Sequence, residues 1–185
     1  MPKAKLAVGL FILSEANFFA LLIIAYVYFH AYPGPGPTAA SALNPLRTGM
    51  FSIALFASSA TMILGVRAYR ARSHRATLAW LTATVVLGGL FLGGQALEYA
   101  GLYRRGVAVN RNLFATTFFT LTGFHGLHVF IGLVAIAIVA ALSASGRLAG
   151  TEREADAIEA VGIYWHFVDA VWVGIFSIVY LWAWL

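Results

Sequence analysis

Five long apolar segments constrain the fold of this sequence more than any other feature. They cover about residues 6–30, 49–69, 76–98, 113–142 and 158–184. An α-helix needs about 20 residues to cross the roughly 30 Å hydrocarbon core of a bilayer, and each segment is long enough. The five prolines lie outside all of these segments, where a missing backbone N–H interrupts no helix. We therefore predict an all-α polytopic membrane protein, a bundle of five transmembrane helices that forms a single membrane domain over residues 1–185.

The composition agrees with this fold and excludes several kinds of site. Hydrophobic residues make up 61% of the chain and charged residues only 10%, whereas soluble domains carry about 25% charged residues. The absence of cysteine excludes disulfides, thiolate metal sites and cysteine nucleophiles. The net charge of +5 lies mostly in short loops, so it predicts the orientation of the spans and gives no support for a nucleic-acid partner.

The distribution of Lys and Arg between the loops predicts the orientation. Cytoplasmic loops carry an excess of these residues. The loops on the N-terminal side of the bundle hold Lys3, Lys5, Arg67, Arg70, Arg72, Arg75, Arg147 and Arg153, and the opposite side holds Arg47, Arg104, Arg105 and Arg111. Eight against four favours a cytoplasmic N-terminus and an external C-terminus.

Six ionisable residues lie within the segments, where such groups are costly and usually face protein or a cavity. They are Glu15, Glu98, His125, His128, His166 and Asp169. At about 1.5 Å of rise per residue, Glu15 and the three histidines reach similar depths, and Glu98 lies nearer the opposite surface. Residues three apart share a helix face. We therefore expect the His125–His128 pair and the His166–Asp169 pair to be able to meet across a helix interface.

Three interpretations of this polar cluster are open from the residues alone. Imidazoles and carboxylates could hold a metal or haem, could form an interhelical hydrogen-bond network, or could relay protons. Gly123 and Gly126 flank the histidines, and small residues favour close helix contact over a porphyrin-wide gap. The network is therefore favoured, and no ladder of groups leads from one membrane face to the other.

The remaining motif residues also have structural interpretations. Glu15 is either a protonatable group on a proton path or beside lipid, or a neutral carboxyl bonded to a neighbour. Glu98 is expected to be an interfacial residue, and the Gly89–Gly93 pattern predicts a close helix contact. No nucleophile arrangement and no phosphate-binding loop is present, so the chain has no recognisable catalytic centre of its own.

Two long stretches resemble a known family. "TFFTLTGFHGLHVFIG" (117–132) and "YWHFVDAVWVGIFSIVYLW" (164–182) resemble the signature helices of subunit III of haem–copper oxidases. "FILSEANFFALLIIAYVYFH" is similar to the family helix with an acidic residue, here Glu15, and "GGQALEYAG" to the family pattern that places Gln95, Glu98 and Tyr99. Helix order and spacing agree along essentially the whole chain.

The resemblance implies a non-catalytic subunit of a proton-pumping terminal oxidase in a bacterial cytoplasmic membrane. It implies docking on subunit I, contact with subunit II, small subunits and membrane lipids, and haem and copper in the partner subunits only, with bound phospholipid expected here. Glu15, Glu98, His125, His128, His166 and Asp169 become family motif positions with structural, proton- or lipid-related roles.

The resemblance also leaves alternatives open. They are a quinol oxidase subunit III, a five-helix accessory protein of a nitric oxide reductase and, last, a self-sufficient metalloenzyme. Many relatives have seven helices with a lipid-filled cleft after the second, and this chain starts where their third would start.

Overall fold

The computed structural model describes residues 3–32, 36–145 and 152–182, and this part of the chain is helical with no strand. Its elements are α1 (Lys3–His30), α2 (Ala39–Ala42), α3 (Pro45–Arg70), α4 (His74–Arg104), α5 (Leu113–Ala144), α6 (Glu152–Phe176) and the π-helical turn η1 (Ser177–Leu181). Within the described residues, five helices are long and apolar enough to cross a membrane. The predicted five-helix bundle is therefore confirmed.

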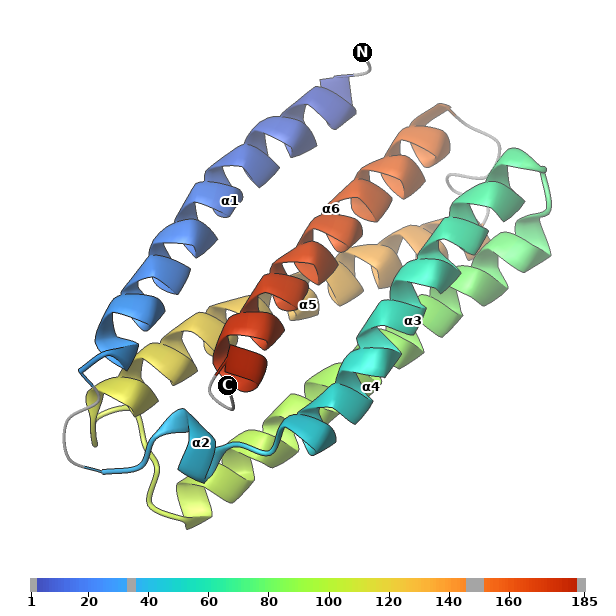
Figure 1. The fold of residues 1–185 in the computed structure, drawn as a ribbon. Helices are drawn as coiled ribbons and strands as arrows, with labels where there is room; N and C mark the ends of the chain where they lie inside the picture. The colour runs from blue at the N-terminus through green and yellow to red at the C-terminus, as the bar shows by residue number, and fades with distance from the viewer. Residues whose placement is uncertain (1–2, 33–35, 146–151, 183–185) are drawn as a thin grey trace.

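Helix α6 lies at the centre of the bundle, as Figure 1 shows. It contacts α1, α3 and α5, while α4 packs against both α3 and α5. Helix α1 lies at the edge and contacts only α5 and α6 extensively among the helices described. The N-terminus lies at one end of the bundle, and the C-terminus lies at the other end, near α2 (Figure 1). The direction of the bundle across the membrane stays a prediction.

Helices α3 and α4 extend beyond the predicted apolar segments, and a polar cap accounts for the earlier start of α3. Helix α3 starts with Pro45 at its first position, and the Asn44 side chain accepts a hydrogen bond from the Arg47 N–H at 3.0 Å, which satisfies a free donor of the first turn. Helix α4 continues to Arg104, so Glu98 lies inside a helix and not at its end. Residues 183 and 184 of the last predicted segment lie outside the described residues.

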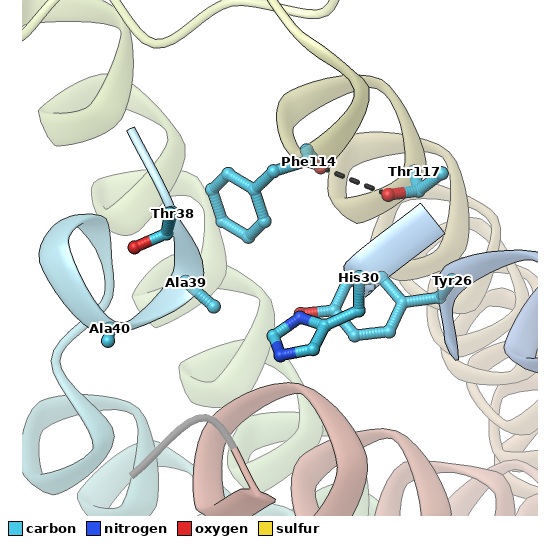
Figure 2. A pocket seen from close by; sticks show the side chains of 7 residues that line it. All are labelled: Tyr26, His30, Thr38, Ala39, Ala40, Phe114 and Thr117. Atoms are coloured by element: carbon cyan, nitrogen blue, oxygen red, sulfur yellow. Dashed lines mark hydrogen bonds between the residues drawn. The ribbon is translucent and has the colours of Figure 1, made fainter. Parts of the chain in front are cut away.

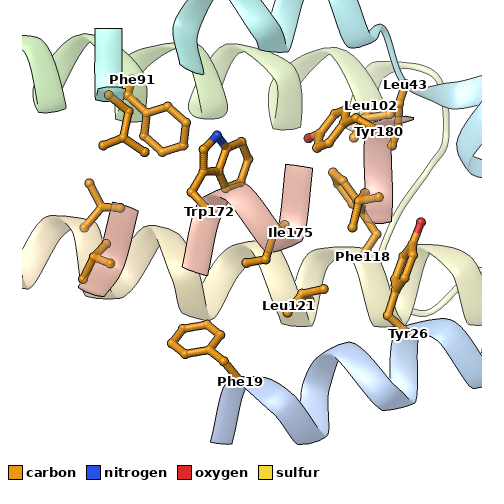
Figure 3. Close-up of a cluster of buried hydrophobic side chains, with 14 of the residues drawn as sticks. Phe19, Tyr26, Leu43, Phe91, Leu102, Phe118, Leu121, Trp172, Ile175 and Tyr180 are labelled. Atoms are coloured by element: carbon orange, nitrogen blue, oxygen red, sulfur yellow. The ribbon is translucent and has the colours of Figure 1, made fainter. Parts of the chain in front are cut away.

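The core follows the side of α6 that faces α3, α4 and α5. Trp165 and Trp172 are both buried, and each donates its indole N–H to a serine of α3: Trp165 to Ser58 at 3.0 Å and Trp172 to Ser52 at 2.9 Å. Figure 3 shows Trp172 beside the ring of Phe91 from α4, with ring centroids 4.8 Å apart. A buried indole N–H needs a partner, so these bonds fix the rotation of α6 against α3.

The close helix contacts of α4 lie beside the glycines expected to make them. A Cβ on Gly89 or Gly93 would meet no atom within 4 Å, so this pair makes no close helix contact within the described part of the chain. A Cβ on Gly88 would lie 2.6 Å from Leu133 of α5, and one on Gly94 would overlap the ring of Phe51 of α3. The pattern located the right turns of the helix, but the packed glycines Gly88 and Gly94 lie on the opposite face from Gly89 and Gly93.

Of the two glycines beside the histidines, Gly126 makes a close helix contact and Gly123 does not. A Cβ on Gly126 would lie 2.7 Å from Oε1 of Gln95, which agrees with the close contact expected there. A Cβ on Gly123 would meet only the Tyr99 hydroxyl at 3.8 Å, an ordinary van der Waals distance. Gly126 therefore allows the Gln95 side chain of α4 to approach α5 closely at this turn.

Candidate functional site

Glu15 of α1 and His128 of α5 form an ion-pair-like contact between two helices. The Oε2 atom of Glu15 lies 3.0 Å from Nε2 of His128, while Nδ1 of His128 lies 2.7 Å from the carbonyl oxygen of Phe124. A carbonyl oxygen only accepts, so Nδ1 must carry a hydrogen. The contact between Nε2 and Oε2 therefore holds one proton, on the carboxyl group or on the imidazole. We call these two residues the Glu15–His128 pair.

The surroundings of the pair fix its geometry. His128 is buried, and the ring of Phe19 packs edge-on against its imidazole at 5.0 Å. The hydroxyl of Tyr164 on α6 donates to the backbone carbonyl of His128 at 3.1 Å. The pair thus links α1 to α5 at a point where α6 also contacts α5.

His125 lies in a different environment from His128, one turn away on the same helix. It has no exposed surface, and its ring stacks on Trp172 at 4.8 Å with Phe91 beside it at 5.9 Å. Neither ring nitrogen has a hydrogen-bond partner in the described part of the chain. Aromatic rings enclose this imidazole, so it can bind neither a metal nor a group of another subunit.

His166 and Asp169 point toward α3 and do not meet the histidines of α5. Nδ1 of His166 lies 3.2 Å from the hydroxyl of Ser59, and Asp169 interacts with the same serine. Both residues are only partly buried, and Oδ1 of Asp169 has no hydrogen-bond partner among the described residues. The expected meeting of the two pairs is wrong because Trp165 and Trp172 occupy the face of α6 that packs in the core.

Glu98 lies in the core of the bundle, and its depth relative to the membrane surface stays a prediction. Only 9% of its surface is exposed. The hydroxyl of Thr48 donates to its Oε1 at 2.8 Å, and the hydroxyl of Tyr180 donates to its Oε2 at 2.7 Å. The π-helical turn η1 allows both Val179 and Tyr180 to be buried. Glu98 therefore links α3, α4 and η1.

A second set of hydrogen bonds joins α4 to α5 one turn away. Nε2 of Gln95 donates to the carbonyl oxygen of Thr122 at 2.8 Å, and the hydroxyls of Tyr99 and Thr122 lie 2.7 Å apart. The roles of Thr48, Ser59 and Thr122 could not be predicted from the sequence, because isolated hydroxyl residues in apolar helices form no recognisable pattern. Their helix positions, opposite Glu98, His166 and Tyr99, become visible only once the helices are packed.

The arrangement can hold protons but offers no metal site within the described residues. No three His, Asp or Glu side chains there come together as ligands. A pocket of about 180 Å³ lies at the α2 end, lined by Tyr26, His30, Thr38, Ala39, Ala40, Phe114 and Thr117 (Figure 2). Its lining includes no carboxylate, so it lacks the acid–base pairing found at Glu15 and His128.

Comparison with known proteins agrees with the motifs. The family model described as cytochrome c oxidase subunit III matches residues 2–184. The chain is 39% identical to "Cytochrome c oxidase subunit 3" of Synechocystis sp., with 94% of this chain and 73% of the relative covered. It is 35% identical to the protein of the same name from Corynebacterium diphtheriae (92% and 83% covered) and 35% identical to "Probable cytochrome c oxidase subunit 3" of Mycobacterium tuberculosis (90% and 82%). The chain therefore belongs to the cytochrome c oxidase subunit III family.

Proposed function

We propose that this subunit docks on subunit I of a proton-pumping terminal oxidase in a bacterial cytoplasmic membrane and supports its proton uptake through the Glu15–His128 pair. Haem and copper belong to the partner subunits in this proposal, and this chain supplies positioning, proton exchange and lipid contact. The Glu15–His128 pair is the observation that carries the proposal.

The pair suits proton exchange because its one proton can be carried by either of two atoms, Nε2 of His128 or Oε2 of Glu15. With Nδ1 of His128 fixed on the Phe124 carbonyl, the proton between Nε2 and Oε2 can lie on either atom without any change in net charge. Ionisable groups inside a membrane are a hallmark of proton and ion pathways. A neutral unit of this kind can stay buried in the membrane and still exchange a proton at its carboxyl group, and the Glu15 side chain is 21% exposed.

An apolar pocket beside the pair supports contact with lipid. The pocket has a volume of about 250 Å³ and is lined by Val8, Phe11, His128, Ile131, Ala135, Ala160, Val161 and Tyr164. Apart from the His128 and Tyr164 side chains its lining is aliphatic or aromatic, which suits a hydrocarbon segment of a phospholipid. We place a lipid chain here, against the same histidine that shares a proton with Glu15.

The partly buried His166 and Asp169 support docking on subunit I through the α3–α6 face. Oδ1 of Asp169 is buried and lacks a partner within the described residues, so it is not open to a neighbouring subunit. Subunit I would contact this cluster through the parts of the His166 and Asp169 side chains that remain exposed. Subunit II and small subunits would complete the complex. The relatives are cytochrome c oxidase subunits, which favours a cytochrome c oxidase over the quinol-oxidase and nitric-oxide-reductase alternatives.

The test compares two glutamine substitutions in the purified oxidase. In Glu15→Gln the amide N–H can still donate to Nε2 of His128, so the contact survives while the exchangeable carboxyl is lost. Glu98→Gln is the matched control, because Glu98 is also a buried carboxyl but belongs to a closed core network. We expect slower proton uptake, measured by stopped-flow with a pH dye, for Glu15→Gln only. Wild-type proton uptake in a Glu15→Gln oxidase of complete subunit composition would refute the proton role.

A further inference from the structure

Helix α1 presents a continuous seam on the side that faces away from the bundle. Its residues are spaced alternately three and four apart, and all of them are exposed: Leu6, Leu10, Leu13, Asn17, Ala20, Ile24 and Val27. Phe19 and Tyr26, on the opposite side of the helix, are 2% and 1% exposed and pack into the core. This spacing is the heptad repeat of a coiled coil, with Leu10, Asn17 and Ile24 at the a positions.

Asn17 is the one seam residue that lipid cannot accommodate. It lies eleven residues from Leu6 and thirteen from His30 in the span Leu6–His30, and so near the middle of the bilayer. One of its amide hydrogens is donated to the Leu13 carbonyl at 2.8 Å. The other N–H and Oδ1 have no hydrogen bond within the described residues, and hydrocarbon offers them none. The seam therefore requires a partner with both a donor and an acceptor at this depth.

A second copy of the chain meets this requirement. A carboxamide is both donor and acceptor, so two Asn17 side chains can satisfy each other. A two-fold axis along the membrane normal places both at the same depth. A single Asn at an a position also specifies a paired, in-register coiled coil, and membrane helices commonly cross at the same angle as coiled coils. We propose that α1 pairs in parallel with α1 of a second copy of this chain, and so joins two oxidase complexes.

Cysteine cross-linking in membranes that contain the whole oxidase tests this pairing, because the chain has no cysteine of its own. Ile24→Cys lies at an a position, where a parallel pair brings the two Cα atoms within disulfide range, about 4.4–6.8 Å. Ile53→Cys on α3 is the matched control. Ile24 and Ile53 are 63% and 67% exposed, and both lie near the α2 end of their helices.

We expect mild oxidation to convert Ile24→Cys, and not Ile53→Cys, into a product of twice the subunit mass. Leu10→Cys should behave like Ile24→Cys, and Asn17→Leu added to Ile24→Cys should remove most of the product. Equal cross-linking of the two isoleucine sites would overturn the pairing. So would a product that contains a different subunit, or a dimer that Asn17→Leu leaves unchanged. These outcomes bear on the seam alone and leave the proton role of Glu15 untouched.

Discussion

Replacement of Gly94 by alanine tests whether the α3–α4 contact has the packing described above. A Cβ at this position would lie 2.5 Å from Cδ1 and Cδ2 of Phe51 and closer still to its Cγ. These atoms lie at the base of the ring, so a rotation of the ring tip cannot relieve the overlap. At Gly93, one residue earlier on the same helix, a Cβ would meet no atom within 4 Å. Gly93→Ala is therefore a matched control.

The two substitutions share one energetic term and differ in another. Replacing glycine by alanine inside a helix stabilises it by about 1 kcal/mol. Overpacking a filled core costs about 1–3 kcal/mol, and contact with three ring atoms places Gly94→Ala at the upper end. We expect Gly94→Ala to lose about 2 kcal/mol and Gly93→Ala to gain about 1 kcal/mol. Since about 1 kcal/mol shifts the melting temperature of a chain of this size by roughly 2–4 °C, the two variants should melt about 6–12 °C apart.

The melting temperature of the detergent-solubilised subunit, followed by circular dichroism, measures this difference. Phe51→Ala should make Gly94→Ala harmless relative to Phe51→Ala alone, because it removes Cγ, Cδ1 and Cδ2, the atoms that the new methyl group would overlap. Equal melting temperatures for Gly93→Ala and Gly94→Ala, or an unchanged cost of Gly94→Ala in the Phe51→Ala background, would refute the packing assigned to Gly94.

Three further substitutions test the polar residues. Tyr180→Phe removes the 2.7 Å hydrogen bond to Glu98 and should cost about 1.5–3 kcal/mol in thermal melts, whereas Tyr28→Phe at an exposed site should cost nothing measurable. Asp169→Ala should weaken retention of the subunit in the purified oxidase and shorten its lifetime during turnover, with the initial rate of oxygen reduction unchanged; immediate loss of all activity in an intact complex would contradict this. His125→Leu should change stability by no more than about 1 kcal/mol, since the loss of ring stacking is offset by removal of two unpartnered nitrogens, and should leave iron and copper contents unchanged; loss of either metal would revive the metal-site interpretation.

The sequence was sufficient to predict the helices, because the length and hydropathy of a span depend on local composition alone. The ends of the helices depended on caps such as Asn44 and on the continuation of α4 past Glu98. Such features indicate the end of a helix much less clearly than a long apolar segment indicates the helix itself. The burial of Glu98 could not be predicted for this reason: the helix continues to Arg104, and Thr48 and Tyr180 surround the carboxyl group.

The partners of the site residues could not be predicted, because they depend on how each helix is rotated. Depth alone placed Glu15, His128 and His166 at one level, and it could not distinguish which of them meet. The side of α6 that carries Trp165 and Trp172 packs in the core, which turns His166 toward Ser59 and leaves His128 to pair with Glu15. The large aromatic residues, by their burial, determine the partners of the small polar ones.

The polar residues of the spans differ in whether their hydrogen bonds are completed within the chain. Glu98 is satisfied within the chain, whereas Asp169 on α6 and Asn17 on α1 each have an atom that the described residues leave unpaired. Asn17 points away from the bundle, on the side opposite Phe19, so the proposed contacts with subunit I and with a second copy use different surfaces. If Asp169→Ala releases the subunit from subunit I, the Ile24→Cys cross-link should persist. Disappearance of the cross-link together with subunit I would mean that both residues belong to one interface.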